Sequence, residues 1–103
     1  MHPSILQHQK EIAKICKRFG VRKLEVFGSA ARGDDFDEAN SDADFLVEFK
    51  PHGQLGPLEE FFGLREELAK VIGRRVDLVE PRAVRNPYIL AQINQARETV
   101  FDA

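Results

Sequence analysis

The sequence lacks the features that mark secreted, membrane-spanning or nucleic-acid-coating proteins. It contains one cysteine, Cys16, so no disulfide can form within the chain, and we expect a reducing, cytoplasmic environment. No apolar run approaches the ~18 residues of a membrane-spanning helix, and residues 1–10 lack the apolar core of a signal peptide. The formal net charge is -2, whereas a nucleic-acid-binding surface favours a basic balance. We therefore expect no membrane association and no direct nucleic-acid binding.

What is present is the composition of an ordinary globular domain. Hydrophobic residues make up 43% and charged residues 31% of the 103 positions. A chain of this length can bury one hydrophobic core and not two. We predict one domain that covers residues 1–103.

Hydrophobic periodicity predicts an alternation of helices and strands. The expected helices cover residues 4–18, residues 57–72 and a segment that begins at Pro87 after an Asn86 N-cap. The expected strands cover residues 21–27, 42–49, 74–80 and 99–101. Gly20 and Gly73 stand where the first two helices should end. The expected buried stripe of the second helix consists of Leu58, Phe61, Phe62, Leu68, Val71 and Ile72.

Alternation within the three main strands predicts a sheet with two different faces. Positions expected to face the helices are Leu24, Val26, Phe45, Val47, Val76 and Leu78. The opposite face carries Asp42, Asp44 and Asp77. This pattern predicts an α+β fold, with a small mixed β-sheet that has helices packed on one face and carboxylates on the other.

The carboxylates suggest a metal site. Residues i and i+2 of a strand point to one side, roughly 7 Å apart along the backbone, so Asp42 and Asp44 should project together. Two carboxylates at that separation repel by about 2.4 kcal/mol at an effective dielectric near 20, and a divalent cation between them removes that cost. Hard oxygen ligands suit Mg²⁺, and two ions could serve an in-line displacement. We expect Asp42, Asp44 and Asp77 to be both metal ligands and catalytic residues.

A phosphate-binding segment precedes the aspartates. Gly28 lets the backbone approach an anion closely, and a helix that opens after Ser29 would direct free N–H groups at it. Arg32 and Arg75 could neutralise a triphosphate or the charge that develops during reaction. With Ser41 directly ahead of the aspartates, we expect Gly28, Ser29, Arg32 and Ser41 to bind the nucleotide.

Each part also has an ordinary structural explanation. A Gly-Ser pair after a strand is usually a turn, and an Asp-x-Asp sequence at a strand start is usually solvated or caps a turn. Asp77 could simply pair with Arg74 or Arg75. It is the combination of these parts, in this order, that favours a magnesium–nucleotide site.

Other metal sites do not fit the spacing. An EF-hand loop that began at Asp35 would have Asn40 in place of its glycine and Leu46 in place of its final glutamate. The histidines His2, His8 and His52 lack the spacing of a zinc site.

The motifs together resemble a known family. Residues 26–34 read Val-Phe-Gly-Ser-Ala-Ala-Arg-Gly-Asp, and residues 41–47 read Ser-Asp-Ala-Asp-Phe-Leu-Val. From about residue 21 to residue 80 the chain resembles the nucleotidyltransferase superfamily related to DNA polymerase β, and more closely the minimal nucleotidyltransferases (MNT) of HEPN–MNT toxin–antitoxin systems. The resemblance implies a polymerase β-like fold in which Gly28 and Ser29 hold the triphosphate, Asp42 and Asp44 bind magnesium, and Asp77 completes the triad. The spacer between the two motifs is slightly longer than is usual in the family, which indicates a small loop insertion at residues 35–39.

The resemblance also implies a reaction and a partner. Larger members of the superfamily carry an added domain that binds the acceptor, and we expect a partner or a second copy to supply it here. A HEPN-domain ribonuclease toxin is the implied partner, with a tyrosine hydroxyl that receives AMP from Mg·ATP, so that the chain acts as an antitoxin.

Two alternatives stay open. The chain could be a non-catalytic module that neutralises its partner by sequestration, using exposed apolar residues such as Tyr88, Leu55 or Leu58. It could also be a homodimeric transferase that acts on a small-molecule hydroxyl. The sequence does not indicate the acceptor residue, the number of AMP groups added, the nucleotide preference or the oligomeric state.

Overall fold

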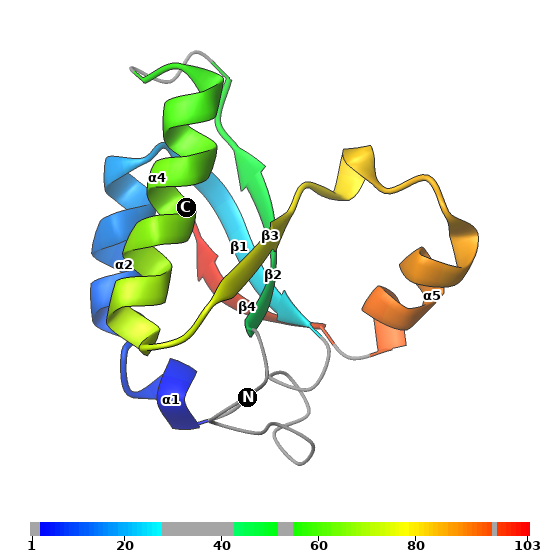
Figure 1. Cartoon of the computed structure of the whole chain (residues 1–103), viewed down its shortest axis with the longest axis horizontal. Coiled ribbons are helices and arrows are strands. Elements are labelled where there is room, and N and C mark those ends of the chain that lie inside the picture. The colour runs from blue at the N-terminus through cyan, green and yellow to red at the C-terminus, as the bar shows by residue number, and fades with distance from the viewer. Residues whose placement is uncertain (1–2, 28–42, 52–54, 96) are drawn as a thin grey trace.

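The computed structural model describes residues 3–27, 43–51, 55–95 and 97–103 (Figure 1). Its elements are α1 (Pro3–Leu6), α2 (Gln9–Arg18), β1 (Val21–Phe27), β2 (Ala43–Phe49), α4 (Pro57–Ile72), β3 (Val76–Val79), a 3₁₀ turn η1 (Pro81–Ala83), α5 (Pro87–Gln95) and β4 (Arg97–Asp102). None of the helices in the described ranges is long and apolar enough to cross a membrane.

The four strands form one mixed sheet in the order β3-β2-β1-β4. β1 and β2 are the inner strands: β1 pairs antiparallel with both β2 and β4, while β2 pairs parallel with β3. A parallel neighbour requires a crossover, and α4 provides it between β2 and β3. The predicted small mixed sheet of an α+β fold is confirmed.

The helix layer consists of α2 and α4, which lie on one side of the sheet (Figure 1). α5 stands apart from this layer, beyond the other side of the sheet. The expectation of helices on one face is therefore correct for α2 and α4. It is wrong for α5, which lies on the side of the sheet that carries the carboxylates.

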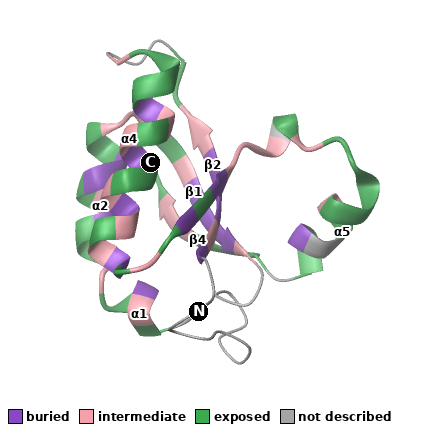
Figure 2. Cartoon of the chain, viewed as in Figure 1, coloured by how far each residue is buried: buried purple, intermediate pink, exposed green. Residues whose placement is uncertain are grey.

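The hydrophobic core lies between the sheet and the helix layer, where the buried residues of both meet (Figure 2). All six strand positions predicted to face the helices are in it. Cys16 of α2 is fully buried there, and burial raises the pKa of its thiol to about 12. Gly20 and Gly73, predicted to end the first two helices, follow α2 and α4 with φ angles of 71° and 78°, the left-handed conformation that glycine adopts without strain.

The buried stripe of α4 differs from the prediction. Leu58 and Phe62 are 72% and 44% exposed, whereas the buried residues are Glu60, Leu64, Leu68 and Ile72. These four repeat at intervals of four residues. Leu58 and Phe62 each lie two residues, about 200° of helical rotation, from a member of that line, so they face away from the sheet.

Three boundaries also differ. The first expected helix is split into α1 and α2 by a turn at Gln7 and His8, where the His8 N–H donates to the Ile5 carbonyl at 3.1 Å. β3 is shorter than residues 74–80, and β4 is longer than residues 99–101. Both ends of β4 extend along β1, and this pairing explains the extra length.

Close packing joins the two main helices. A Cβ atom at Gly63 of α4 would lie 2.5 Å from the Cε1 atom of Phe19, the residue that ends α2. Glycine at position 63 therefore lets the Phe19 ring lie against the backbone of α4.

Candidate active site

Asp44 and Asp77 lie side by side on the open face of the sheet. Their Cα atoms are register partners in the parallel pair β2–β3, a position in which neighbouring strands are about 4.8 Å apart. The residues that flank Asp44, Ala43 and Phe45, are buried in the core, so its own side chain points the other way. Asp44 is half-buried and Asp77 is exposed. The structure thus brings together two of the three predicted carboxylates.

The local sequence explains this placement. β2 and β3 each alternate apolar core residues with residues of the open face, which puts every second side chain on the same side. The Ala43 N–H donates to the Arg75 carbonyl at 3.0 Å, and this bond fixes the start of β2 against the residue that precedes β3.

The other predicted site residues lie outside the described ranges. They are Gly28, Ser29, Arg32, Ser41 and Asp42. Their assignment to nucleotide or metal binding stays a prediction. Within the described ranges, no group of three or more histidine, cysteine, aspartate or glutamate residues could hold a metal ion. The Asp44–Asp77 pair supplies hard oxygen donors of the kind that Mg²⁺ prefers, and the sequence predicts Asp42 as the third carboxylate.

The two carboxylates belong to a row of four positions that crosses the sheet. Phe27 of β1 is the register partner of Asp44, and Arg97 of β4 is the register partner of Phe27. From β4 to β3, the residues in this row across the open face are therefore Arg97, Phe27, Asp44 and Asp77. We call them the carboxylate row. It places a guanidinium group at one end and two carboxylates at the other.

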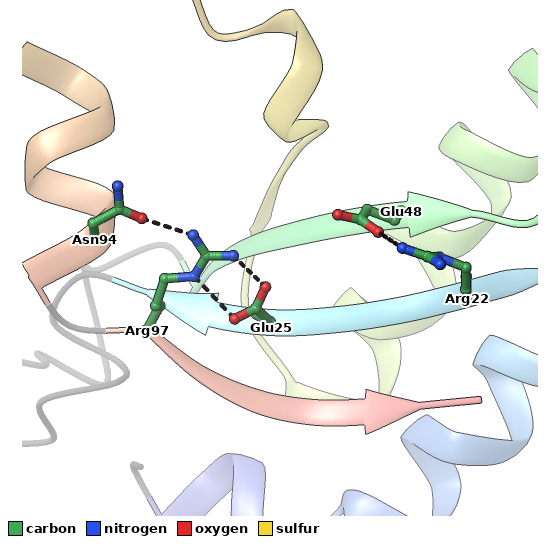
Figure 3. A network of polar contacts seen from close by, with 5 residues as sticks. All are labelled: Arg22, Glu25, Glu48, Asn94 and Arg97. Atoms are coloured by element: carbon green, nitrogen blue, oxygen red, sulfur yellow. Dashed lines mark hydrogen bonds and ion pairs between the residues drawn. The ribbon is translucent and has the colours of Figure 1, made fainter. Parts of the chain in front are cut away.

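Arg97 is held in an ion pair with Glu25 (Figure 3). Its Nε and Nη2 atoms donate to the two carboxylate oxygens of Glu25 at 3.0 Å and 2.6 Å, and its Nη1 atom donates to Asn94 Oδ1 at 2.7 Å. Glu25 is a buried residue of the inner strand β1, so its charge needs such a partner. The hydrogen bonds from Arg97 hold the pKa of Glu25 below its ordinary value, and those to Glu25 raise the pKa of Arg97.

Sequence reasoning missed the Glu25–Arg97 pair, whose members are 72 residues apart. Alternation puts Glu25, which lies between the core residues Leu24 and Val26, on the open face, where a carboxylate is ordinarily solvated. No pattern in the sequence therefore indicates its burial or its partner.

A second ion pair and a pocket lie nearer the other end of β2. Arg22 Nη2 donates to Glu48 Oε2 at 2.7 Å, and both side chains are exposed (Figure 3). A pocket of about 240 Å³ beside them is lined by Arg22, Val47, Glu48, Phe49, Glu80 and Pro81. Because Asp44 is at the start of β2 and Glu48 near its end, this pocket is separate from the carboxylates.

The sequence matches the nucleotidyltransferase domain family over residues 9–100. It is 35% identical over 91 residues to a Methanocaldococcus jannaschii protein named as a proposed protein adenylyltransferase, a match that covers 88% of this chain and 86% of the relative. It is 39% identical over 79 residues to the protein adenylyltransferase MntA of Thermococcus cleftensis, which covers 77% of this chain and 72% of the relative.

Solved structures show the same fold. One, described as a proposed minimal nucleotidyltransferase, has a TM-score of 0.72 at 29% identity and 95% coverage of both chains. A chain of the complex between tri-AMPylated Shewanella oneidensis HEPN toxin and MNT antitoxin has a TM-score of 0.63 at 18% identity, with 96% of this chain and 73% of that chain covered. Agreement of sequence over most of the chain, together with agreement of fold, places the protein in the nucleotidyltransferase domain family, among the minimal nucleotidyltransferases.

Proposed function

We propose that this nucleotidyltransferase transfers AMP from ATP to a hydroxyl group of a partner protein in a magnesium-dependent reaction. The partner we propose is a HEPN-domain ribonuclease toxin that receives AMP on a tyrosine, so that this chain acts as its cytoplasmic antitoxin. The observation that carries the proposal is the Asp44–Asp77 pair on the open face of the sheet. The names of the two relatives support protein adenylylation, and the Shewanella oneidensis complex supports a HEPN partner.

The proposed roles follow from the chemistry of the side chains. Asp42, Asp44 and Asp77 would hold two Mg²⁺ ions through carboxylate oxygens, and residue 42 precedes β2 by one position. When bound, magnesium neutralises charge on the phosphates during transfer. Gly28, Ser29, Arg32 and Ser41 would bind the triphosphate through backbone N–H groups, hydroxyls and a guanidinium.

The transfer itself is an in-line displacement. The tyrosine hydroxyl oxygen attacks the α-phosphorus of ATP, the bond from that phosphorus to the bridging oxygen breaks, and pyrophosphate leaves. The proton of the hydroxyl passes to the Asp77 carboxylate, the more exposed member of the pair and hence the one open to an acceptor. In this proposal residues 1–103 form one catalytic domain, and the partner brings the acceptor group.

The test is an intact-mass spectrum of the HEPN-domain partner after incubation with this chain, ATP and magnesium. The proposal predicts a mass gain of one or more AMP units with the wild-type chain and none with Asp42→Asn/Asp44→Asn. A matched control is Asp102→Asn, which removes an exposed aspartate of β4 and should leave the mass gain intact. If the partner remains unmodified after incubation with the wild-type chain, ATP and magnesium, the proposed activity on that acceptor is rejected.

Sequestration is the second candidate function. The observation that favours it is the exposure of apolar side chains, 81% for Tyr88 and 72% for Leu58, which suits binding to another protein. A stable complex that forms equally well with wild-type and Asp42→Asn/Asp44→Asn chains, in the absence of any mass gain, would support this function in place of transfer.

A further inference from the structure

α5 has an unusual position among the helices. α2 and α4 cover the core, whereas α5 lies beyond the open face and is mostly exposed (Figure 2). Of its side chains whose burial the structure describes, only Ile93 is buried. Tyr88 and Ile89 at its start are 81% and 46% exposed. The helix sequence, PYILAQINQ, contains no charged residue. A surface helix that is uncharged and exposes a tyrosine and an isoleucine has the composition of a protein-binding surface.

Polar contacts define both ends of α5. At its start the Asn86 side chain caps the helix, because Oδ1 accepts a hydrogen bond from the Tyr88 N–H at 2.9 Å. At its end Asn94 accepts a hydrogen bond from Arg97, whose other donors bind both oxygens of Glu25 (Figure 3). A bidentate ion pair has a fixed geometry, and Glu25 belongs to β1, an inner strand that pairs with a strand on each side. Arg97 therefore fixes the end of α5 relative to the sheet.

The contact places the C-terminal end of α5 near the carboxylates. Arg97 is the first residue of the carboxylate row. Its backbone lies two strand spacings, and thus about 10 Å, from that of Asp44. A protein acceptor that reaches the Asp44–Asp77 pair from the open side of the sheet approaches the same face beyond which α5 stands.

We propose that α5 is the docking surface for the protein that receives AMP, and that Arg97 is a positioning residue that fixes α5 through Glu25 and Asn94. This inference rests on the proposed function. The occupant is the acceptor protein, through an uncharged apolar surface that packs on Tyr88 and Ile89. Arg97 acts on the acceptor through α5, so its loss affects acceptor binding and leaves nucleotide binding unchanged.

The experiment uses the whole chain and the HEPN-domain partner. It measures the Kd of the complex by titration calorimetry, and the KM values for ATP and for the partner in AMP transfer. The variants are Tyr88→Ala and Arg97→Met. Arg22→Met is the matched control, because Arg22 forms the other arginine–glutamate pair near the far end of β2. Tyr88→Phe is the conservative variant, which keeps the ring.

The proposal predicts a Kd about tenfold weaker for Tyr88→Ala and about fivefold weaker for Arg97→Met. The KM for the partner rises in proportion, and the KM for ATP is unchanged. Arg22→Met and Tyr88→Phe bind within about twofold of the wild type. Tyr88 is on the surface, so Tyr88→Ala decides the question even if Arg97→Met fails to fold.

Other outcomes contradict the proposal in distinguishable ways. Wild-type affinity in Tyr88→Ala, or an equal rise of both KM values in Arg97→Met, overturns it. A dimer of this chain that Tyr88→Ala dissociates assigns the surface to a second copy and also overturns it. If the variants lose affinity as predicted but neither the wild type nor any variant transfers AMP, the docking surface is supported and the proposed chemistry is rejected. Failure of the wild-type chain to bind the partner rejects both.

Discussion

The Cα atoms of Asp44 and Asp77 are register partners on the two parallel strands of an otherwise antiparallel sheet. Two carboxylates in this relationship project from the same face, about one strand spacing apart. Two carboxylates this close repel each other, and a divalent cation bound between them offsets that repulsion. The register explains how Asp77 of β3, 33 positions along the chain from Asp44 (77 − 44), could complete the proposed aspartate triad.

The Glu25–Arg97 pair predicts a pH-dependent contribution to stability. Arg97 lowers the pKa of Glu25 in the folded state below the unfolded value of about 4.3. A depressed carboxylate pKa stabilises the fold above the unfolded pKa, and this stabilisation is lost as the pH falls through the folded pKa. Glu25→Gln should therefore lower the free energy of unfolding by about 1–2 kcal/mol at pH 7 and by less near pH 3.

Urea unfolding of the wild type and of Glu25→Gln at both pH values measures this difference. Glu48→Gln is the control, because the Arg22–Glu48 pair is exposed and contributes little. A difference between wild type and Glu25→Gln that is the same at both pH values contradicts the assigned role of the ion pair.

The contact between Gly63 and Phe19 predicts that Gly63→Ala destabilises the fold. Alanine favours a helix over glycine by about 1 kcal/mol, but its Cβ would lie 2.5 Å from the Phe19 ring and push α2 and α4 apart. We expect a net loss of about 1–2 kcal/mol in the free energy of unfolding. Gly56→Ser is the comparison, since a Cβ there meets no atom within 4 Å and serine is a good N-cap. Equal stability of Gly63→Ala and wild type would show that the ring moves aside freely.

Cys16 should be chemically inert in the folded protein. It is fully buried, and desolvation raises the pKa of its thiol to about 12, so the reactive thiolate is scarce at pH 8. A thiol-specific reagent at pH 8 should label the chain only after denaturant unfolds it. Labelling of the native protein at the rate of a free thiol contradicts this prediction.

Much of the fold could be predicted from the sequence because core residues recur at alternate positions in three strands. Alternation alone assigns Phe45 and Val47 to one side of β2 and Asp44 to the other, and the structure confirms the core side. The identity of strand neighbours could not be predicted in this way. Alternation places Asp44 and Asp77 on the same face, but only the strand order makes them adjacent.

The errors have related physical causes. The sequence predicts Leu58 and Phe62 of α4 in the core, but the helix packs its Leu64 side against the sheet. Because apolar residues occur all around this helix, the sequence pattern does not decide which side is buried. The position of α5 and the Glu25–Arg97 pair depend on the path of the chain after β3. No local pattern in the sequence encodes that path.

The most direct test of the account is the rate of AMP transfer by Asp77→Asn. Asp77 is exposed, so the substitution should leave the thermal unfolding midpoint unchanged while it removes the proposed proton acceptor beside Asp44. We expect kcat to fall at least about a hundredfold, with Asp102→Asn as the matched surface control at wild-type rate. A folded Asp77→Asn chain that transfers AMP as fast as the wild type would contradict the assignment of this carboxylate pair as the catalytic centre.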